Sequence, residues 1–140
     1  MKRVTGLGGV FFKCGDRAAL TEWYRKHLGL EISGAGAWDF EWREAKEPER
    51  MGRTVFAFFD PDTDYFDPSG KDLMFNFRVD DLDAVLAALR AEGVEVDDRV
   101  EEYPYGRFGW ITDPEGRRIE LWEPNAEMER KAGSGESSRG

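Results

Sequence analysis

Apolar side chains follow first a strand period and then a helix period near the start of the chain. Residues 8–14 alternate with a period of two, which predicts a strand with Val10, Phe12 and Cys14 on one face. Apolar residues then recur three and four positions apart between Asp16 and Gly29, which predicts a helix lying on a sheet, with these two residues as its caps. Further strands are predicted at residues 30–33, 38–43 and 53–59.

The same order of elements returns in the second half of the chain. A strand is predicted at residues 73–79, a helix at 82–92, and strands at 94–96, 107–112 and 118–122. The last two strands flank a tight turn that contains Pro114 and Gly116. Neither half is large enough to bury its own sheet. We therefore predict an α+β domain of two tandem βαβββ modules forming a curved mixed sheet around a cleft.

The chain divides into two modules, a linker and a tail. Module one covers about residues 6–60, a linker rich in Asp, Pro and aromatic residues covers 61–71, and module two covers about 72–124. Residues 1–124 are expected to form one domain, since 140 residues is an ordinary size for a single core. The last eight residues contain only Gly, Ser, Glu and Arg, so we expect 125–140 to be a flexible C-terminal tail.

Composition excludes several classes of protein. The formal net charge of −9 argues against nucleic-acid binding, because that affinity comes largely from Lys and Arg. We expect a cytoplasmic protein that does not bind membranes, since no stretch has the length and apolarity of a membrane span or a signal peptide. Cys14 is the only cysteine and His27 the only histidine, which excludes an internal disulfide, cysteine-based zinc clusters and sites with two histidines.

Three segments, taken together and in order, resemble the vicinal oxygen chelate superfamily, which includes glyoxalase I, extradiol dioxygenases and bleomycin-resistance proteins. They are residues 23–30 (WYRKHLGL), 77–83 (FRVDDLD) and 109–124 (GWITDPEGRRIELWEP). The resemblance covers both halves, from about residue 6 to residue 124. It implies a duplicated fold in which the first and last strand of each module can supply ligands to a divalent metal inside the curved sheet.

Most of the metal positions that the resemblance implies lack a metal-binding side chain. They correspond to Gly9, Phe56, Met74 and Glu120, with Ala57 in place of Phe56 if that strand shifts by one residue. Only Glu120 suits a hard cation, whereas zinc, manganese or iron needs three or four protein ligands. We therefore expect no metal and no other cofactor. Metal-dependent glyoxalase or dioxygenase activity is disfavoured.

Strand parity places polar and aromatic residues together on the sheet face that turns away from the helices. Such a mixed face would be a poor core but a suitable wall for a ligand. Glu120 would either hold a ligand or pair with an arginine on a neighbouring strand, such as Arg78. The candidate ligand-binding residues are Glu120, Arg78, Asn76, Phe56, Phe58, Trp122, Phe11 and Met74. No residue is assigned a catalytic role.

Three functions agree with the sequence. The first is a metal-free protein that binds a small molecule, such as a drug or an aromatic metabolite, and forms a homodimer. The second is a lyase, isomerase or dioxygenase acting on a small carbonyl or aromatic compound through Glu120 or an unrecognised metal site. The third is an interaction protein whose cleft is only a dimer seam. The pattern leaves open whether the two modules pair within one chain or across a dimer.

Overall fold

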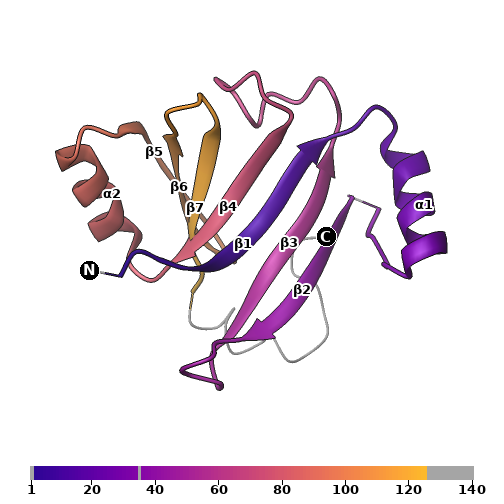
Figure 1. Cartoon of the computed structure of the whole chain (residues 1–140), viewed down its shortest axis with the longest axis horizontal. Coiled ribbons are helices and arrows are strands. Elements are labelled where there is room, and N and C mark those ends of the chain that lie inside the picture. Colours follow the sequence, from indigo (N-terminus) through magenta and orange to yellow (C-terminus); the bar gives the residue numbers. More distant parts are fainter. Residues whose placement is uncertain (1, 35, 126–140) are drawn as a thin grey trace.

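One mixed sheet runs through both modules (Figure 1). The structure is a computed structural model that describes residues 2–34 and 36–125. Its strands lie in the order β2-β3-β1-β4-β7-β6-β5. The elements along the chain are β1 (Val4–Lys13), α1 (Arg17–Leu28), β2 (Ala37–Arg43), β3 (Met51–Phe59), β4 (Leu73–Val79), α2 (Leu82–Ala91), β5 (Glu95–Tyr103), β6 (Gly106–Thr112) and β7 (Arg118–Glu123). The predicted α+β class is confirmed. The predicted tail falls almost entirely on residues 126–140, outside the described residues.

Strands β1 and β4 join the two modules within one chain. They pair antiparallel, with Val10 opposite Phe75 and Phe11 opposite Met74. Each is flanked by a parallel partner, β3 beside β1 and β7 beside β4. Among the described residues, no helix is both long and apolar enough to span a membrane.

Two predicted strands differ from the structure. Residues 30–33 form no strand; instead the Ser33 N–H donates to the Ala37 carbonyl at 2.9 Å, so that a short turn leads from α1 into β2. The strand predicted at residues 94–96 is the much longer β5, Glu95–Tyr103. It lies at the edge of the sheet and is mostly charged, as edge strands often are, so hydrophobic alternation does not reveal its length.

Both helices begin with an aspartate cap, which was expected at Asp16 but not at Asp81, and they relate differently to the sheet. Asp16 accepts the Ala19 N–H at 3.0 Å, and Asp81 accepts the Ala84 N–H at 3.1 Å. Helix α2 buries Leu82, Val85 and Leu86 against the sheet. None of the twelve residues of α1, all of them described, is buried. This helix was expected to lie on the sheet; it contacts the sheet through Tyr24, whereas Trp23 and Leu28 of its apolar stripe are exposed.

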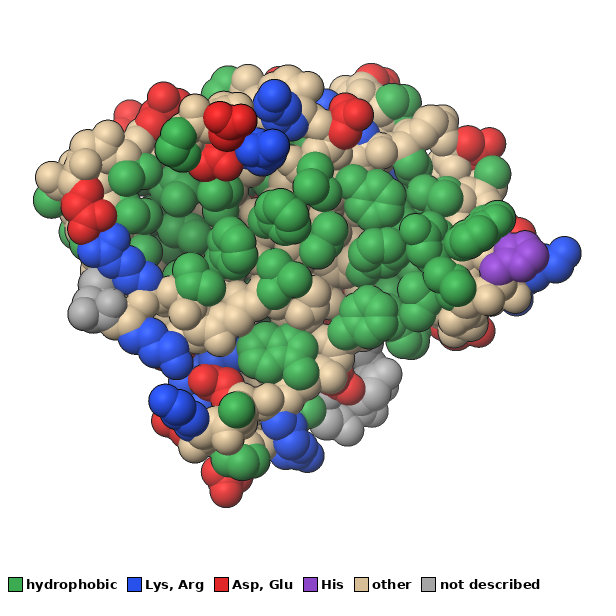
Figure 2. Space-filling view, in the orientation of Figure 1, with side chains coloured by type: hydrophobic (Ala, Val, Ile, Leu, Met, Phe, Trp, Pro, Cys, Tyr) green, Lys and Arg blue, Asp and Glu red, His purple; other side chains and the backbone are tan. Residues whose placement is uncertain are grey.

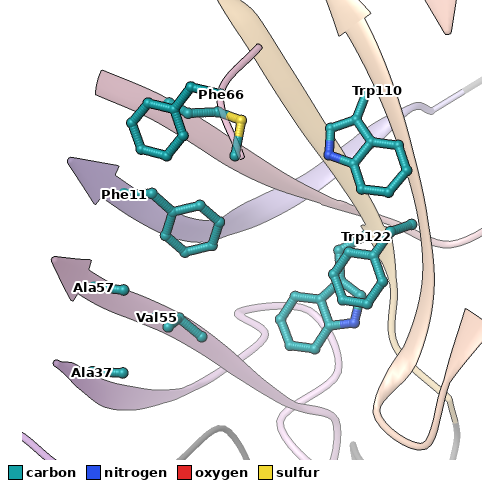
Figure 3. Close-up of a cluster of buried hydrophobic side chains, with 9 residues drawn as sticks. Phe11, Ala37, Val55, Ala57, Phe66, Trp110 and Trp122 are labelled. Carbon is teal, nitrogen blue, oxygen red and sulfur yellow. The ribbon is translucent and has the colours of Figure 1, made fainter. Parts of the chain in front are cut away.

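The main hydrophobic cluster lies on the face that bears Phe11, Met74 and Glu120, here called the inner face (Figure 3). Phe66 from the linker packs into it and is fully buried. The expectation that this face would be a poor core is thus wrong. The linker brings its own aromatic rings onto the face, and these complete a core that the strands alone would leave open. The opposite face, which bears Val10, Phe12 and the two helices, is the outer face.

Candidate functional site

Glu120 lies near the middle of the inner face with no exposed surface. Strand register places it between Asn76 on β4 and Trp110 on β6. Its carboxylate accepts hydrogen bonds from Asn76 Nδ2 at 2.5 Å, from Trp110 Nε1 at 3.1 Å and from the Tyr65 hydroxyl. These three neutral donors stabilise the carboxylate by hydrogen bonding, as buried polar groups require. Glu120 therefore serves as the centre of an internal polar network.

The backbone beside this network comes unusually close to Asn76. The pairing of β1 with β4 shifts register between Leu7 and Gly9, and Gly8 lies in this irregular segment. A Cβ atom on Gly8 would lie 2.1 Å from Asn76 Oδ1, so only glycine fits there without displacing the amide. The position of Asn76 is thus set by both neighbouring strands.

A pocket of about 430 Å³ opens on the inner face next to the Glu120 network. Two of its wall residues, Tyr65 and Trp110, also donate hydrogen bonds to Glu120, so the carboxylate lies directly behind the wall. The linker forms one side, and strands β5, β6 and β7 form the other. The lining residues are Asp64, Tyr65, Asp67, Arg99, Glu101, Tyr103, Trp110 and Arg118.

Two arginines approach the Trp110 ring inside this pocket. The guanidinium carbon of Arg118 lies 5.0 Å from the ring centroid and that of Arg99 lies 5.5 Å away. Arg118 is almost fully buried and its Nη1 lies 3.3 Å from Asp97 Oδ2. The Arg99 side chain is exposed, and its Nη1 lies 3.4 Å from Glu101 Oε2. The pocket wall therefore presents both charge signs around aromatic rings.

Asp97 holds this wall in place, and its pKa is lowered. The main cause is a hydrogen bond from the Arg99 backbone N–H, to which Arg118 adds a side-chain contact. A carboxyl with a depressed folded-state pKa contributes stability above its unfolded pKa and loses it as the pH falls through the folded value. Asp97→Asn should therefore lower the free energy of unfolding by about 1 kcal/mol at pH 7.

Urea denaturation at neutral and acidic pH measures this effect. The difference between wild type and Asp97→Asn should shrink as the pH falls below about 4, because the unfolded chain takes up a proton there and the folded carboxyl follows only at lower pH. The exposed neighbour Asp98 offers a matched control, Asp98→Asn. An equal loss of stability at pH 7 and pH 3 would show that the charge of Asp97 is not what stabilises the wall.

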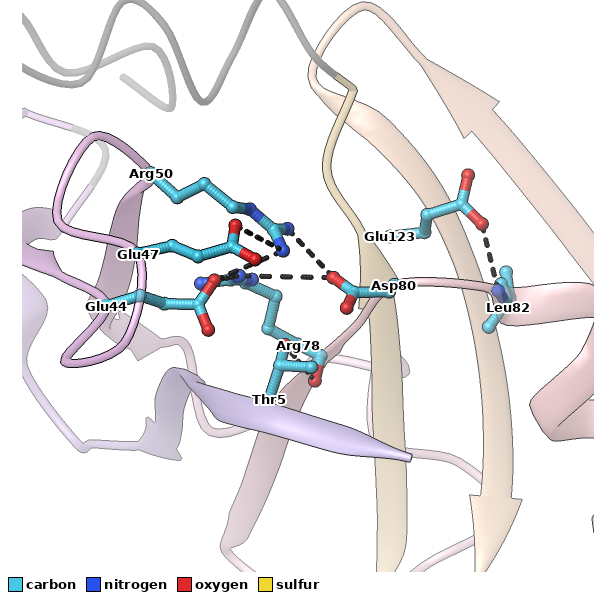
Figure 4. A network of polar contacts seen from close by, with 8 residues as sticks. All are labelled: Thr5, Glu44, Glu47, Arg50, Arg78, Asp80, Leu82 and Glu123. Atoms are coloured by element: carbon cyan, nitrogen blue, oxygen red, sulfur yellow. Dashed lines mark hydrogen bonds and ion pairs between the residues drawn. The ribbon is translucent and has the colours of Figure 1, made fainter. Parts of the chain in front are cut away.

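Arg78 is buried at another part of the inner face and does not line the pocket. Its Nη2 lies 2.8 Å from Glu44 Oε2, and its guanidinium carbon lies 5.1 Å from the centroid of the Trp42 ring. Arg50 bridges Glu44 and Asp80 at 3.2 and 2.8 Å (Figure 4). Arg78 therefore belongs to a network that ties the loop between β2 and β3 to the end of β4.

Phe56 and Phe58 were expected on the same face as Glu120, and this expectation is wrong. They lie opposite Val10 and Phe12 of β1, on the outer face, where both contact Tyr24 of α1. The inner positions of β3 belong to Val55 and Ala57. Every residue from 55 to 59 is apolar, so hydrophobic alternation could not show which side chains of this strand face the inner side of the sheet.

The remaining candidates, Phe11, Met74 and Trp122, all lie in the inner-face cluster and are at most 1% exposed. Trp122 stacks on Phe108 with ring centroids 6.0 Å apart, and its Nε1 donates to the Tyr105 carbonyl at 2.9 Å. None of the three lines the pocket. Sequence reasoning selected none of the eight wall residues. Six of them come from the linker and from β5, where only aromatic and charged composition gave a signal, and the other two are Trp110 on β6 and Arg118 on β7.

The inner face does not provide the donor set of a metal site. Within residues 2–34 and 36–125, no three His, Cys, Asp or Glu side chains come together in a way that could hold an ion. The positions that the superfamily resemblance implies are Gly9, Ala57, Met74 and Glu120, and the Glu120 oxygens already accept three hydrogen bonds. These residues do not fit zinc, manganese or iron, which need several anionic or imidazole ligands.

A more open groove of about 480 Å³ lies on the other side of β1, against α1. Its walls include Cys14, Asp16, Leu20, Trp23 and Tyr24. Partial burial raises the pKa of the Cys14 thiol, which favours the unreactive neutral form. We place the candidate functional site in the inner-face pocket, although the groove is larger, because polar and aromatic groups converge there.

Comparison with known proteins identifies the family. The model of the glyoxalase-like domain matches residues 9–122. The chain therefore belongs to the glyoxalase-like domain family, within the vicinal oxygen chelate superfamily. No curated protein shows significant similarity to it.

Solved structures of similar fold include three structures of methylmalonyl-CoA epimerase. The enzyme from Mycobacterium tuberculosis is 24% identical, with 89% of this chain and 91% of that chain covered and a TM-score of 0.55. An epimerase in complex with methylmalonyl-CoA and NH4+ is 20% identical, with 88% and 96% covered and a TM-score of 0.63. A Streptomyces coelicolor variant in complex with 2-nitronate-propionyl-CoA is 21% identical, with 85% and 96% covered and a TM-score of 0.60. At these identities the likeness shows the fold alone.

Proposed function

We propose that this protein binds a small molecule in the inner-face pocket without a metal ion. The observation that carries the proposal is the state of Glu120, whose oxygens accept hydrogen bonds from Tyr65, Asn76 and Trp110. The carboxylate oxygens are therefore engaged in hydrogen bonds within the protein. Beside it lies a pocket of about 430 Å³, within the range that small ligands occupy.

The pocket wall suits a ligand that has an aromatic ring and a positively charged substituent. Tyr65, Tyr103 and Trp110 supply rings for stacking. The charged lining consists of two arginines and three carboxylates, and Asp64 and Asp67 are exposed at the rim. A cationic group would bind at this rim while the ring packs deeper. A cationic, ring-bearing drug or metabolite meets both requirements.

Calorimetric titration and thermal denaturation with a bleomycin-type cationic glycopeptide test the proposal. A ligand at about 100 times its Kd stabilises the folded state by about 2.7 kcal/mol, a rise in Tm of several degrees. Tyr103→Ala should weaken binding by at least about tenfold, since it removes an aromatic ring from a partly exposed position of the wall. Val100→Ala is a matched control, because Val100 lies on the same strand but does not line the pocket.

The alternative function is enzymatic, with Glu120 acting on a carbonyl compound such as methylmalonyl-CoA. It is supported by the fold that this chain shares with methylmalonyl-CoA epimerases. Incubation with methylmalonyl-CoA in D2O measures it directly through exchange of the α-proton. Exchange that disappears in Glu120→Gln would contradict the binding function, as would a rise in Tm with Mn²⁺, Zn²⁺ or Ni²⁺ that the same variant abolishes. The binding function would also be contradicted if the glycopeptide produced neither binding heat nor a change in Tm.

A further inference from the structure

Arg118 is a nearly buried cation in the wall of the inner-face pocket, with only 4% of its surface exposed. Its Nη1 lies 3.3 Å from Asp97 Oδ2, which is long for a hydrogen bond between charged groups. Its Nε is buried and has no hydrogen-bond acceptor among residues 2–34 and 36–125. Buried charges in proteins are normally paired and fully hydrogen-bonded. The described residues therefore leave this guanidinium incompletely satisfied.

The groups that hold Arg118 leave its pocket side available. Asp97 is not among the residues that line the pocket, and its carboxylate is shared, since Oδ1 accepts the Arg99 backbone N–H at 2.9 Å. The Trp110 ring contacts the guanidinium, whose carbon lies 5.0 Å from the ring centroid. A ring attracts a guanidinium but does not replace the strong acceptors that its N–H groups bind. Asp97 and Trp110 thus fix the side chain without using all of its donors.

The charges of the pocket are divided between its two sides. Asp64 and Asp67 are exposed on the linker side and form an acidic rim. Arg118 lies on the opposite side, on β7. Arg99 and Glu101 of β5 lie 3.4 Å apart and largely balance each other. A ligand in this pocket therefore meets negative charge at the rim and a buried positive charge on the strand side.

The outer-face groove beside α1 lacks this arrangement. Among the described residues that line it, Asp16 is the only one with a charged side chain. Figure 2 shows hydrophobic side chains gathered over the sheet between the two helices. A ligand that carries charges of both signs is therefore matched by the inner-face pocket rather than by the groove.

We propose that the ligand of the inner-face pocket is a zwitterion with an aromatic ring, whose carboxylate binds Arg118 and whose cationic group binds the acidic rim. This inference rests on the proposed function and adds an anionic group to the ligand described there. A guanidinium pairs with a carboxylate through two parallel hydrogen bonds, and one carboxylate balances its single charge. A phosphate would bring nearly two negative charges beside three wall carboxylates. Aromatic α-amino acids and their derivatives carry the required groups.

Calorimetric titration of the full chain with three matched indoles tests the proposal. L-Tryptophan carries both charges, tryptamine carries only the ammonium group, and indole-3-propionate carries only the carboxylate. L-Tryptophan should bind wild type at least about tenfold more tightly than either of the others, because each of them lacks one charged contact. Inorganic phosphate should not displace it.

Arg118→Met should abolish the preference for L-tryptophan over tryptamine, because it removes the cation and keeps most of the apolar stem. Arg117→Met is the matched control and should keep the preference, since the Arg117 side chain is 41% exposed and does not line the pocket. Asp97→Asn decides the test if Arg118→Met fails to fold. It removes the carboxylate that competes for the guanidinium, so L-tryptophan should bind severalfold more tightly, whereas tryptamine should not. A purely structural role of Arg118 predicts no such gain.

The outcomes separate this inference from the proposed function. Equal affinities of wild type for L-tryptophan and tryptamine would overturn the inference and leave the binding function intact. Binding of the glycopeptide without binding of L-tryptophan would have the same meaning. Displacement of L-tryptophan by inorganic phosphate would assign the anion site to phosphate and also overturn the inference. If neither the glycopeptide nor any of the indoles binds, the proposed function fails together with it.

Discussion

Glu120→Ala is expected to lower the free energy of unfolding by about 3–5 kcal/mol. The substitution leaves the donors of Tyr65, Asn76 and Trp110 facing a cavity where the carboxylate accepted their hydrogen bonds. Glu120→Gln should cost less, because the amide keeps one oxygen acceptor and nearly the same volume. It still destabilises, since its NH2 group faces another donor. Urea denaturation at neutral pH measures both effects.

A suitable control is Glu49→Ala, which removes an exposed carboxylate and should change stability by at most about 0.5 kcal/mol. The comparison also separates a structural role of Glu120 from a chemical one. If Glu120→Gln keeps full stability but abolishes proton exchange on a carbonyl compound, the carboxylate acts on a substrate and the enzymatic alternative is correct. If both variants are destabilised and no exchange occurs in wild type, Glu120 maintains the wall of a binding pocket.

Arg78→Ala should lower the free energy of unfolding by about 3 kcal/mol. The guanidinium is buried between Glu44 and the Trp42 ring, so its removal costs an ion pair and leaves a cavity. Arg78→Met should cost less, since it restores apolar volume and Glu44 keeps Arg50 at 3.2 Å. A double-mutant cycle with Glu44→Gln, measured by urea denaturation, gives the coupling between the two side chains.

Lys46→Ala in the same loop is the matched control, because Lys46 is exposed. Both Arg78 variants should retain ligand binding at the inner-face pocket, whose wall does not include this residue. Loss of binding in Arg78→Met with unchanged stability would contradict a structural role. It would support the alternative expectation from the sequence that Arg78 contacts the ligand.

Local features of the fold were predicted where the signal lies within a few neighbouring residues. Asp16 accepts the N–H group three positions ahead, as its placement before an amphipathic run indicates, and Asp81 caps the second helix in the same way. The parity of β1 and β4 was also correct, because alternation is clear in both strands. Strand β3 is apolar throughout residues 55–59, so its parity depends on the register of its pairing with β1.

The candidate site was predicted only in part, for a related reason. Sequence parity placed Asn76 and Glu120 on one face, and the structure joins them at 2.5 Å. The other two residues of the Glu120 hydrogen-bond network are Tyr65, from the linker, and Trp110, from β6. A linker has no periodicity that would show where its side chains point. Its position is determined by the burial of Phe66 in the inner-face cluster.

The sequence by itself determined the duplicated order of elements, the helix caps and the shortage of metal ligands at Gly9 and Met74. These follow from residue type and local spacing, which need no knowledge of distant contacts. The tertiary structure alone decided that the linker covers Glu120 and that the stripe of α1 is left largely unburied. Both outcomes depend on where segments far apart in sequence meet, and they are set by the apolar area that packing buries rather than by the local pattern.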